Sequence, residues 1–248
     1  MKNTDGYVPA GKLKLFQKLA EKQHITMIAF GSSNTQRRLP GMTWFDYVEL
    51  GFKSQYGKDC GTFINTGIGG DTADLMLARI DRDVLAYKPD LVIVTVGGND
   101  SNPALQISHD HYHANLLEIH RRIADSGAEV MFQTYYALLP EKLPPEMIGR
   151  MDRNMQIVRE TAVETGSFLQ DNYRRWNRLR ERFPDVHALL MQDGLHVTAD
   201  GNAVIGADLL RSFGISLPPE FAREFSIGRV GQALLDALEP TERIQGIK

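Results

Sequence analysis

The chain has 248 residues, 42% of them hydrophobic, and a formal charge of −3, which suits one α/β domain and gives no indication of nucleic-acid binding. Its single cysteine, Cys60, excludes an intrachain disulfide. Residues 1–24 are polar, and no apolar run approaches the roughly 18 to 20 residues of a membrane span. We therefore expect a cytoplasmic protein that does not associate with membranes.

Short apolar runs that end in glycine or polar residues predict the strands. The clearest is 90–96, a continuous β-branched run of the kind that a parallel sheet buries on both faces. The other strands are expected at 25–30, 62–65, 129–134 and 167–169. Apolar residues at helical spacing predict helices between them. These helices are expected at 43–56, 72–86, 108–125, 145–165, 171–182 and 200–213.

Strands that alternate with helices predict a parallel sheet covered on both faces. We expect a single domain over 1–248, a three-layer α/β/α sandwich with a mostly parallel sheet of about five strands. Residues 1–24 should form a helical extension that packs through 13–19 on this domain. Residues 215–248 form a C-terminal extension with a predicted helix at 229–238, to which the sequence assigns no task.

The residues that can carry chemistry follow the predicted strands, where parallel sheets bind their ligands. Ser33, Gly70 and Asn99 lie just beyond three successive strands, and Asp193 precedes His196 by three positions in a polar loop. A serine hydroxyl becomes a nucleophile when a histidine takes its proton, and a carboxylate orients that histidine. Backbone N–H groups near glycine and an asparagine amide can stabilise an oxyanion. This set of residues predicts ester hydrolysis.

In its motif blocks and their order, the region 25–213 resembles the SGNH hydrolases, also called GDSL esterases. The resemblance implies the flavodoxin-like fold of that family. It also implies a triad of Ser33, His196 and Asp193 with an oxyanion hole formed by Ser33, Gly70 and Asn99. The first block departs from the usual Gly-Asp-Ser, because Ser32 stands where the family has aspartate.

Several alternatives remain open at the predicted site. Ser32 is a rival nucleophile, and Gly67 is an alternative oxyanion donor, although its place suggests a turn. A backbone carbonyl in place of Asp193 could orient the histidine. Asp71 is expected to cap the following helix, and Asp100 is expected to be structural.

Two further clusters of side chains favour structural interpretations. Four histidines within 109–120 could suggest a metal site, but His113 and His120 share a helical stripe with apolar residues, which favours partly buried imidazoles. The arginines of 171–182 would be distributed around a helix and would not share one face, which favours a solvated surface over an anion or nucleic-acid site. These two sets are His109, His111, His113 and His120, and Arg174, Arg175, Arg178, Arg180 and Arg182.

The function expected from the resemblance is a serine esterase that needs neither a metal nor an organic cofactor. Its first-choice substrate is a short-acyl, acetyl ester of a carbohydrate or another small molecule. A longer-acyl esterase, lysophospholipase or thioesterase is the alternative within the same chemistry. A non-catalytic ligand-binding protein on this fold and a metal-dependent hydrolase are alternatives of other classes. We expect no nucleic-acid partner, and a homo-oligomer is left open.

Overall fold

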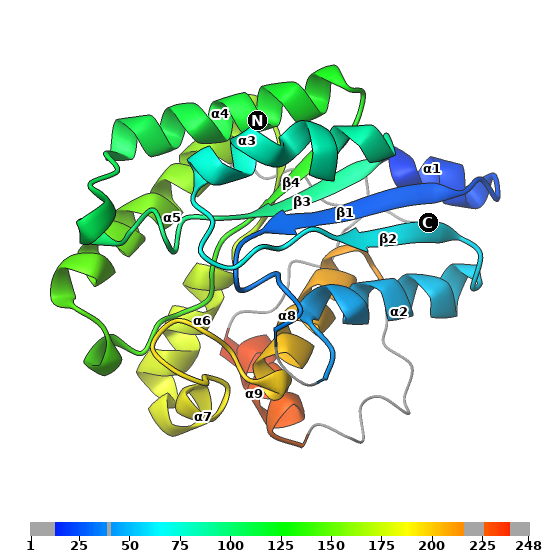
Figure 1. Cartoon of the computed structure of the whole chain (residues 1–248). Coiled ribbons are helices and arrows are strands. Elements are labelled where there is room, and N and C mark those ends of the chain that lie inside the picture. The colour runs from blue at the N-terminus through cyan, green and yellow to red at the C-terminus, as the bar shows by residue number, and fades with distance from the viewer. Residues whose placement is uncertain (1–12, 39–40, 216–225, 239–248) are drawn as a thin grey trace, which may run out of the picture.

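The computed structural model, which describes residues 13–38, 41–215 and 226–238, contains a five-stranded parallel sheet (Figure 1). The strand order is β2-β1-β3-β4-β5, and every neighbouring pair is parallel. This confirms the predicted α/β fold, with a sheet that is wholly parallel in the described part of the chain. The strands are β1 (Ile25–Gly31), β2 (Gly61–Asn65), β3 (Leu91–Thr95), β4 (Glu129–Gln133) and β5 (Phe168–Gln170).

The helices expected between the strands agree with the predicted ranges to within one residue, except after residues 83 and 182. Of the extension expected at 1–24, α1 covers Lys14–Ala20, and α9 begins three residues before the predicted 229. Residues 1–12, 216–225 and 239–248 of the two expected extensions lie outside the described residues.

The helix expected at 72–86 ends early, at Asp83, and is followed by a three-residue 3₁₀ turn at Leu85–Tyr87. Two further 3₁₀ turns lie at Pro103–Leu105 and Pro140–Lys142. A short helix that was not predicted begins at Pro184, since proline is tolerated in a first helical turn. No described helix combines the length and apolarity that crossing a membrane requires. The helices are α1 (Lys14–Ala20), α2 (Trp44–Tyr56), α3 (Ala73–Asp83), α4 (His109–Asp125), α5 (Pro145–Thr165), α6 (Asn172–Arg182), α7 (Pro184–Leu189), α8 (Ala199–Ser212) and α9 (Ser226–Leu238).

Alternate side chains of the strands point into two separate cores, because successive residues of a strand face opposite sides of the sheet. Met27 of β1 packs with side chains of α1, α2, α6, α8 and α9, whereas Ile28 packs with those of α3, α4 and α5. Figure 1 shows α3 and α4 on one side of the sheet and α2, α8 and α9 on the other. Both residues are fully buried, which stabilises the fold by roughly 1.5–3 kcal/mol for each side chain of this size.

Helices α2 and α8 pack closely and hold together the two loops that precede them. A Cβ at Gly206 of α8 would lie 2.5 Å from the Cβ of Tyr47 on α2, so only glycine allows this approach. The Trp44 backbone N–H donates to Asn202 Oδ1 of α8 at 3.0 Å. Its indole N–H donates to the Asn34 carbonyl at 3.0 Å. The loop after β1 is thereby fixed relative to the loop before α8.

Candidate active site

Ser33 lies in the tight turn that follows β1, and its hydroxyl contacts an imidazole from the far end of the chain. The carbonyl of Ser32 accepts the N–H groups of Thr35 and Gln36, each at 3.0 Å, which closes the turn. Ser33 Oγ lies 3.0 Å from Nε2 of His196. A histidine nitrogen at this distance can accept the hydroxyl proton.

The carboxylate of Asp193 holds the other side of this imidazole. Its Oδ2 lies 2.8 Å from His196 Nδ1, while its Oδ1 accepts the backbone N–H groups of Leu195 and His196, each at 2.7 Å. Partial burial would raise the pKa of Asp193, but these backbone donors and the imidazole outweigh it, so the pKa lies below its usual value. Asp193 is therefore a carboxylate that keeps a hydrogen on His196 Nδ1.

Ser32, the rival nucleophile, points elsewhere. It is fully buried, and its Oγ lies 2.8 Å from the hydroxyl of Tyr135. The neighbouring Tyr136 donates to the carbonyl of Leu195 at 2.8 Å and also contacts Asn34, so it joins the serine loop to the histidine loop. Neither tyrosine was predicted as part of the site, although both lie within three residues of the end of β4, where side chains of a parallel sheet approach the ligand.

Three N–H groups in the loops that follow β1, β2 and β3 keep a hydrogen that no described residue accepts. Gly70 adopts a φ of +88°, which favours glycine, and the described residues provide no acceptor for its N–H or for that of Ser33. The side-chain amide of Asn99 donates one hydrogen to the Asp71 carbonyl at 2.8 Å, which leaves its second hydrogen for a ligand. In contrast, the N–H of Gly67 is used locally, because it donates to Asn65 Oδ1 at 3.0 Å.

The expected roles of the two neighbouring aspartates are partly wrong. Thr72, not Asp71, caps α3, because its Oγ1 accepts the N–H of Leu75 at 3.4 Å. Asp71 instead forms a buried ion pair with Arg79, at 2.6 Å. Asp100 is structural as expected, since its Oδ1 accepts the Ala73 N–H at 2.9 Å in the first turn of α3.

Asp100 is expected to make stability depend on pH. The side chain is 1% exposed and its Oδ2 has no partner, so burial raises its pKa to about 6, against the opposing effect of the Ala73 N–H. The folded state therefore holds this proton more tightly than the unfolded state does. The free energy of unfolding should fall as the pH rises through about 4 to 6, by about 3 kcal/mol in total. Urea unfolding across this range should show a weaker fall for Asp100→Asn, and identical slopes would contradict the assignment.

The histidines of α4 contact different elements. His109 contacts Asn154 of α5 at 2.9 Å, His111 contacts Asp74 of α3 at 2.7 Å, and His113 contacts Glu164 at 3.1 Å. Burial lowers the pKa of His120. Among the described residues, no three histidine, cysteine, aspartate or glutamate side chains are grouped so that they could hold a metal ion.

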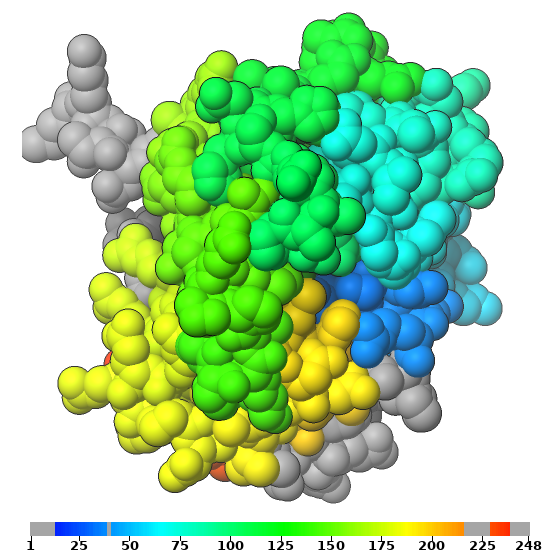
Figure 2. Space-filling model, turned by 60° about the vertical axis from the view of Figure 1, so that its left-hand side comes forward, coloured from blue at the N-terminus to red at the C-terminus, as the bar shows by residue number. Residues whose placement is uncertain are grey.

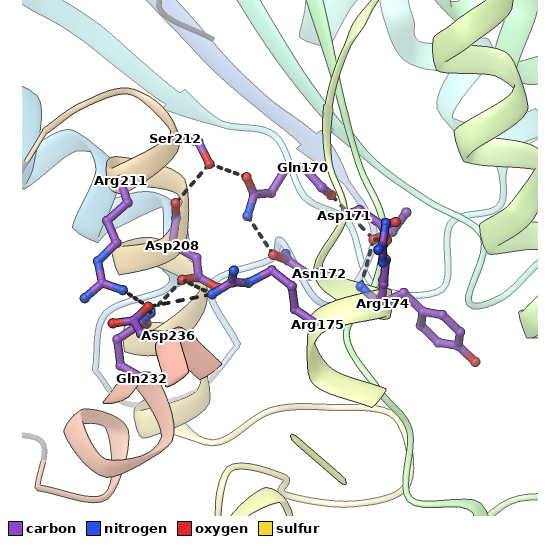
Figure 3. Close-up of polar contacts among 12 residues, drawn as sticks. Gln170, Asp171, Asn172, Arg174, Arg175, Asp208, Arg211, Ser212, Gln232 and Asp236 are labelled. Atoms are coloured by element: carbon purple, nitrogen blue, oxygen red, sulfur yellow. Dashed lines mark hydrogen bonds and ion pairs between the residues drawn. The ribbon is translucent and has the colours of Figure 1, made fainter. Parts of the chain in front are cut away.

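The arginines of α6 do not all lie on a solvated surface, which corrects the prediction. Arg175 is only 8% exposed and forms an ion pair with Asp208 of α8, at 3.3 Å (Figure 3). Arg180 is half-buried and donates to the Leu138 carbonyl at 3.2 Å. The helical pattern of α6 places these two side chains toward the protein, where carboxylate and carbonyl oxygens satisfy them.

Ser33 and His196 line a pocket with mostly polar walls. In Figure 2, chain segments coloured blue, cyan, green and yellow-orange, which include the loops of the site, meet on one face of the molecule. Most of the side chains that line the pocket can form hydrogen bonds, and a few are apolar. The other lining residues are Asn34, Gln36, Arg38, Gly41, Met42, Thr43, Val197, Ala199 and Asn202.

Comparison with known proteins relates this site to one family. Residues 29–204, which include all four loops, match the GDSL-like lipase/acylhydrolase family. Acetylxylan esterase from Geobacillus stearothermophilus is 28% identical over 177 residues, or 68% of this chain and 75% of that enzyme. A crystal structure of an acetylxylan esterase from that bacterium covers 77% of this chain and 94% of its own, with a TM-score of 0.66 and 24% identity. The acetyl xylan esterase AlAXEase covers 75% and 98%, with a TM-score of 0.67 and 20% identity.

The sequence identities to these crystal structures are below 25%, so the structural likeness establishes a shared fold and no more. The family match is broader evidence, since it spans most of the chain and every loop that carries a candidate residue. The chain therefore belongs to the GDSL-like lipase/acylhydrolase family and is a hydrolase that acts on ester bonds.

Proposed function

We propose that this protein is a serine esterase in which Ser33 is the nucleophile, His196 the general base and Asp193 the residue that orients the base. The observation that carries the proposal is a continuous set of contacts. Ser33 Oγ lies 3.0 Å from His196 Nε2, and His196 Nδ1 lies 2.8 Å from Asp193 Oδ2. Both distances suit proton transfer from serine and retention of the other imidazole hydrogen.

The reaction follows from these contacts. As Ser33 Oγ attacks the acyl carbon, His196 Nε2 takes the hydroxyl proton. The oxyanion accepts hydrogen bonds from the N–H groups of Ser33 and Gly70 and from the Asn99 amide, each worth about 3–4 kcal/mol of transition-state stabilisation. The protonated His196 then gives its proton to the leaving alkoxide. Water repeats the sequence, releasing the acid and restoring the serine.

For the substrate, we propose a short acyl ester, above all an acetyl ester, of a carbohydrate or another small polyhydroxylated molecule. Gln36 in the pocket wall supports this, because its half-buried side-chain amide can donate to and accept from hydroxyl groups of the alcohol. The relatives named above are acetylxylan esterases. Related crystal structures are described as catalytic mutants of that enzyme, with a serine, an aspartate or a histidine replaced by alanine, the same residue types as in the proposed triad.

The test combines labelling of the nucleophile with a series of acyl chains. We expect a fluorophosphonate to add to wild type and to Ser32→Ala, as seen by intact mass, but not to Ser33→Ala. We also expect wild type to hydrolyse p-nitrophenyl acetate faster than the butyrate and octanoate. Ser32→Ala is the matched control, since it removes an adjacent hydroxyl that contacts Tyr135 and not the imidazole.

Each other outcome has a definite meaning. Labelling of Ser33→Ala but not of Ser32→Ala would move the nucleophile to Ser32. A preference for octanoate would replace the acetyl ester by a longer acyl ester. A wild type that neither turns over nor takes the label would favour a ligand-binding protein.

A further inference from the structure

A buried arginine on α3 lies at the junction of the loops that carry the proposed oxyanion donors. Arg79 is 8% exposed. Its guanidinium carbon lies 4.7 Å from the centre of the Phe30 ring of β1, within reach of a cation–π contact. A buried cation of this kind needs several partners to offset the loss of its hydration. The identity of those partners indicates its role.

Two of the partners are backbone carbonyls at the start of the loops that follow β1 and β2. Arg79 Nη2 donates to the carbonyl of Gly31 at 3.0 Å, and Nη1 donates to that of Thr66 at 2.7 Å. The Gly31 carbonyl also accepts the N–H of Ile68 at 3.0 Å. The guanidinium therefore joins the strand end that leads to Ser33 with the loop that leads to Gly70.

The carboxylate partner extends this connection to the third donor. Arg79 Nε donates to Asp71 Oδ2 at 2.6 Å, and the carbonyl of the same aspartate accepts the side-chain amide of Asn99 at 2.8 Å. Asp71 directly follows Gly70, so its position also fixes the peptide next to the proposed donor. A second carboxylate, Asp83, contacts Nη1 at 2.9 Å and completes the set.

We propose that Arg79 is a positioning residue that holds the N–H of Ser33, the N–H of Gly70 and the amide of Asn99 in one arrangement for the oxyanion. This inference rests on the esterase function proposed above. The guanidinium acts through Gly31, Thr66 and Asp71 and is not itself a catalytic group. Its planar fork is what allows three directions of contact at once. A lysine ammonium keeps the charge but cannot reproduce this geometry.

The test compares Arg79→Lys with a matched control, Arg175→Lys. Both variants replace a buried guanidinium that is paired with aspartate, but Arg175 contacts Asp208, outside the site loops. We expect Arg79→Lys to lower kcat for p-nitrophenyl acetate about 10- to 100-fold at nearly unchanged KM. Binding of a boronic acid that mimics the tetrahedral intermediate should weaken in parallel with kcat. Arg175→Lys should leave both unchanged below its melting temperature.

A milder variant covers the case in which Arg79→Lys does not fold. Asp71→Asn keeps the carbonyl that orients Asn99 and removes only the charge that faces the guanidinium, so we expect a smaller loss of kcat in the same direction. If wild type is active and both variants keep its kcat and boronic-acid affinity, the role of Arg79 is overturned while the esterase function stands. A wild type without turnover or fluorophosphonate labelling would overturn both proposals.

Discussion

Replacing Asp193 by asparagine is expected to lower kcat about 10,000-fold while the protein stays folded. The reason lies in how the carboxylate is held. Its Oδ1 accepts the backbone N–H groups of Leu195 and His196, each at 2.7 Å. In the variant the amide oxygen must keep this place, because an NH₂ group there would face two N–H donors. The NH₂ group is therefore directed at Nδ1 of His196.

A donor in that position forces the wrong imidazole tautomer. Nδ1 must then accept a hydrogen bond, so the imidazole hydrogen moves to Nε2, which can no longer take the proton of Ser33. Asp193→Ala does not impose this tautomer. We therefore expect the alanine variant to keep a higher kcat than the asparagine variant, although it loses more of the hydrogen bonds that shape the loop.

The measurement is kcat and KM for p-nitrophenyl acetate, together with the melting temperature of each variant. Asp74→Asn is the matched control, because Asp74 contacts His111 at 2.7 Å and its side chain is 45% exposed, against 48% for Asp193. This control should retain wild-type kcat. An asparagine variant at position 193 with wild-type kcat would contradict the proposed role, and one less impaired than alanine would contradict the tautomer argument.

The sequence was sufficient to predict the parallel sheet and the edge of the sheet at which the candidate residues lie. Buried strands such as β3 are short, continuous runs rich in β-branched residues, a pattern typical of a parallel sheet covered on both faces. Once the strands are parallel, their carboxyl ends lie at one edge of the sheet, so Ser33, Gly70 and Asn99 must lie near each other. The loop of His196 follows no strand of the sheet, so the family resemblance was needed to bring it to this edge.

Polar residues that act from inside the protein were not predicted, and the reason is physical. An arginine on a helix has the same sequence signal whether it meets water or a buried carboxylate. Arg79 was overlooked for this reason, and Arg175 was assigned to the surface. Asp71 was expected to cap a helix because aspartate commonly does so, but the adjacent Thr72 takes that place. Only the three-dimensional contacts separate such cases.

Helix α9, in the C-terminal extension, packs on α6 and α8 through a buried polar network (Figure 3). Asp208 of α8 is fully buried, and burial raises its pKa, against the opposing effects of Arg175 and Gln232. Gln232 of α9 donates to Asp208 Oδ1 at 2.6 Å, and Arg175 Nε lies 3.3 Å from Oδ2. The extension is thus connected to the fold by a charge that has no access to water.

Arg175→Met is expected to lower the free energy of unfolding by roughly 3–5 kcal/mol. The variant leaves the Asp208 carboxylate buried without its cation, and uptake of a proton offsets only part of that cost. Urea unfolding at neutral pH measures the loss. Arg182→Met, at an exposed position of the same helix, is the control and should change stability by less than about 0.5 kcal/mol.

The double variant Arg175→Met with Asp208→Leu separates the cost of an unpaired charge from the loss of packing. With both charges replaced by apolar side chains, no ion remains buried between α6 and α8, and Gln232 can still donate to Asp236 Oδ1, at 3.1 Å. Most of the stability lost in Arg175→Met should therefore return. A double variant less stable than Arg175→Met would show that the ion pair itself stabilises the docking of α9. The kcat for p-nitrophenyl acetate should be unchanged in both variants, since neither residue contacts the loops that carry Ser33 and His196.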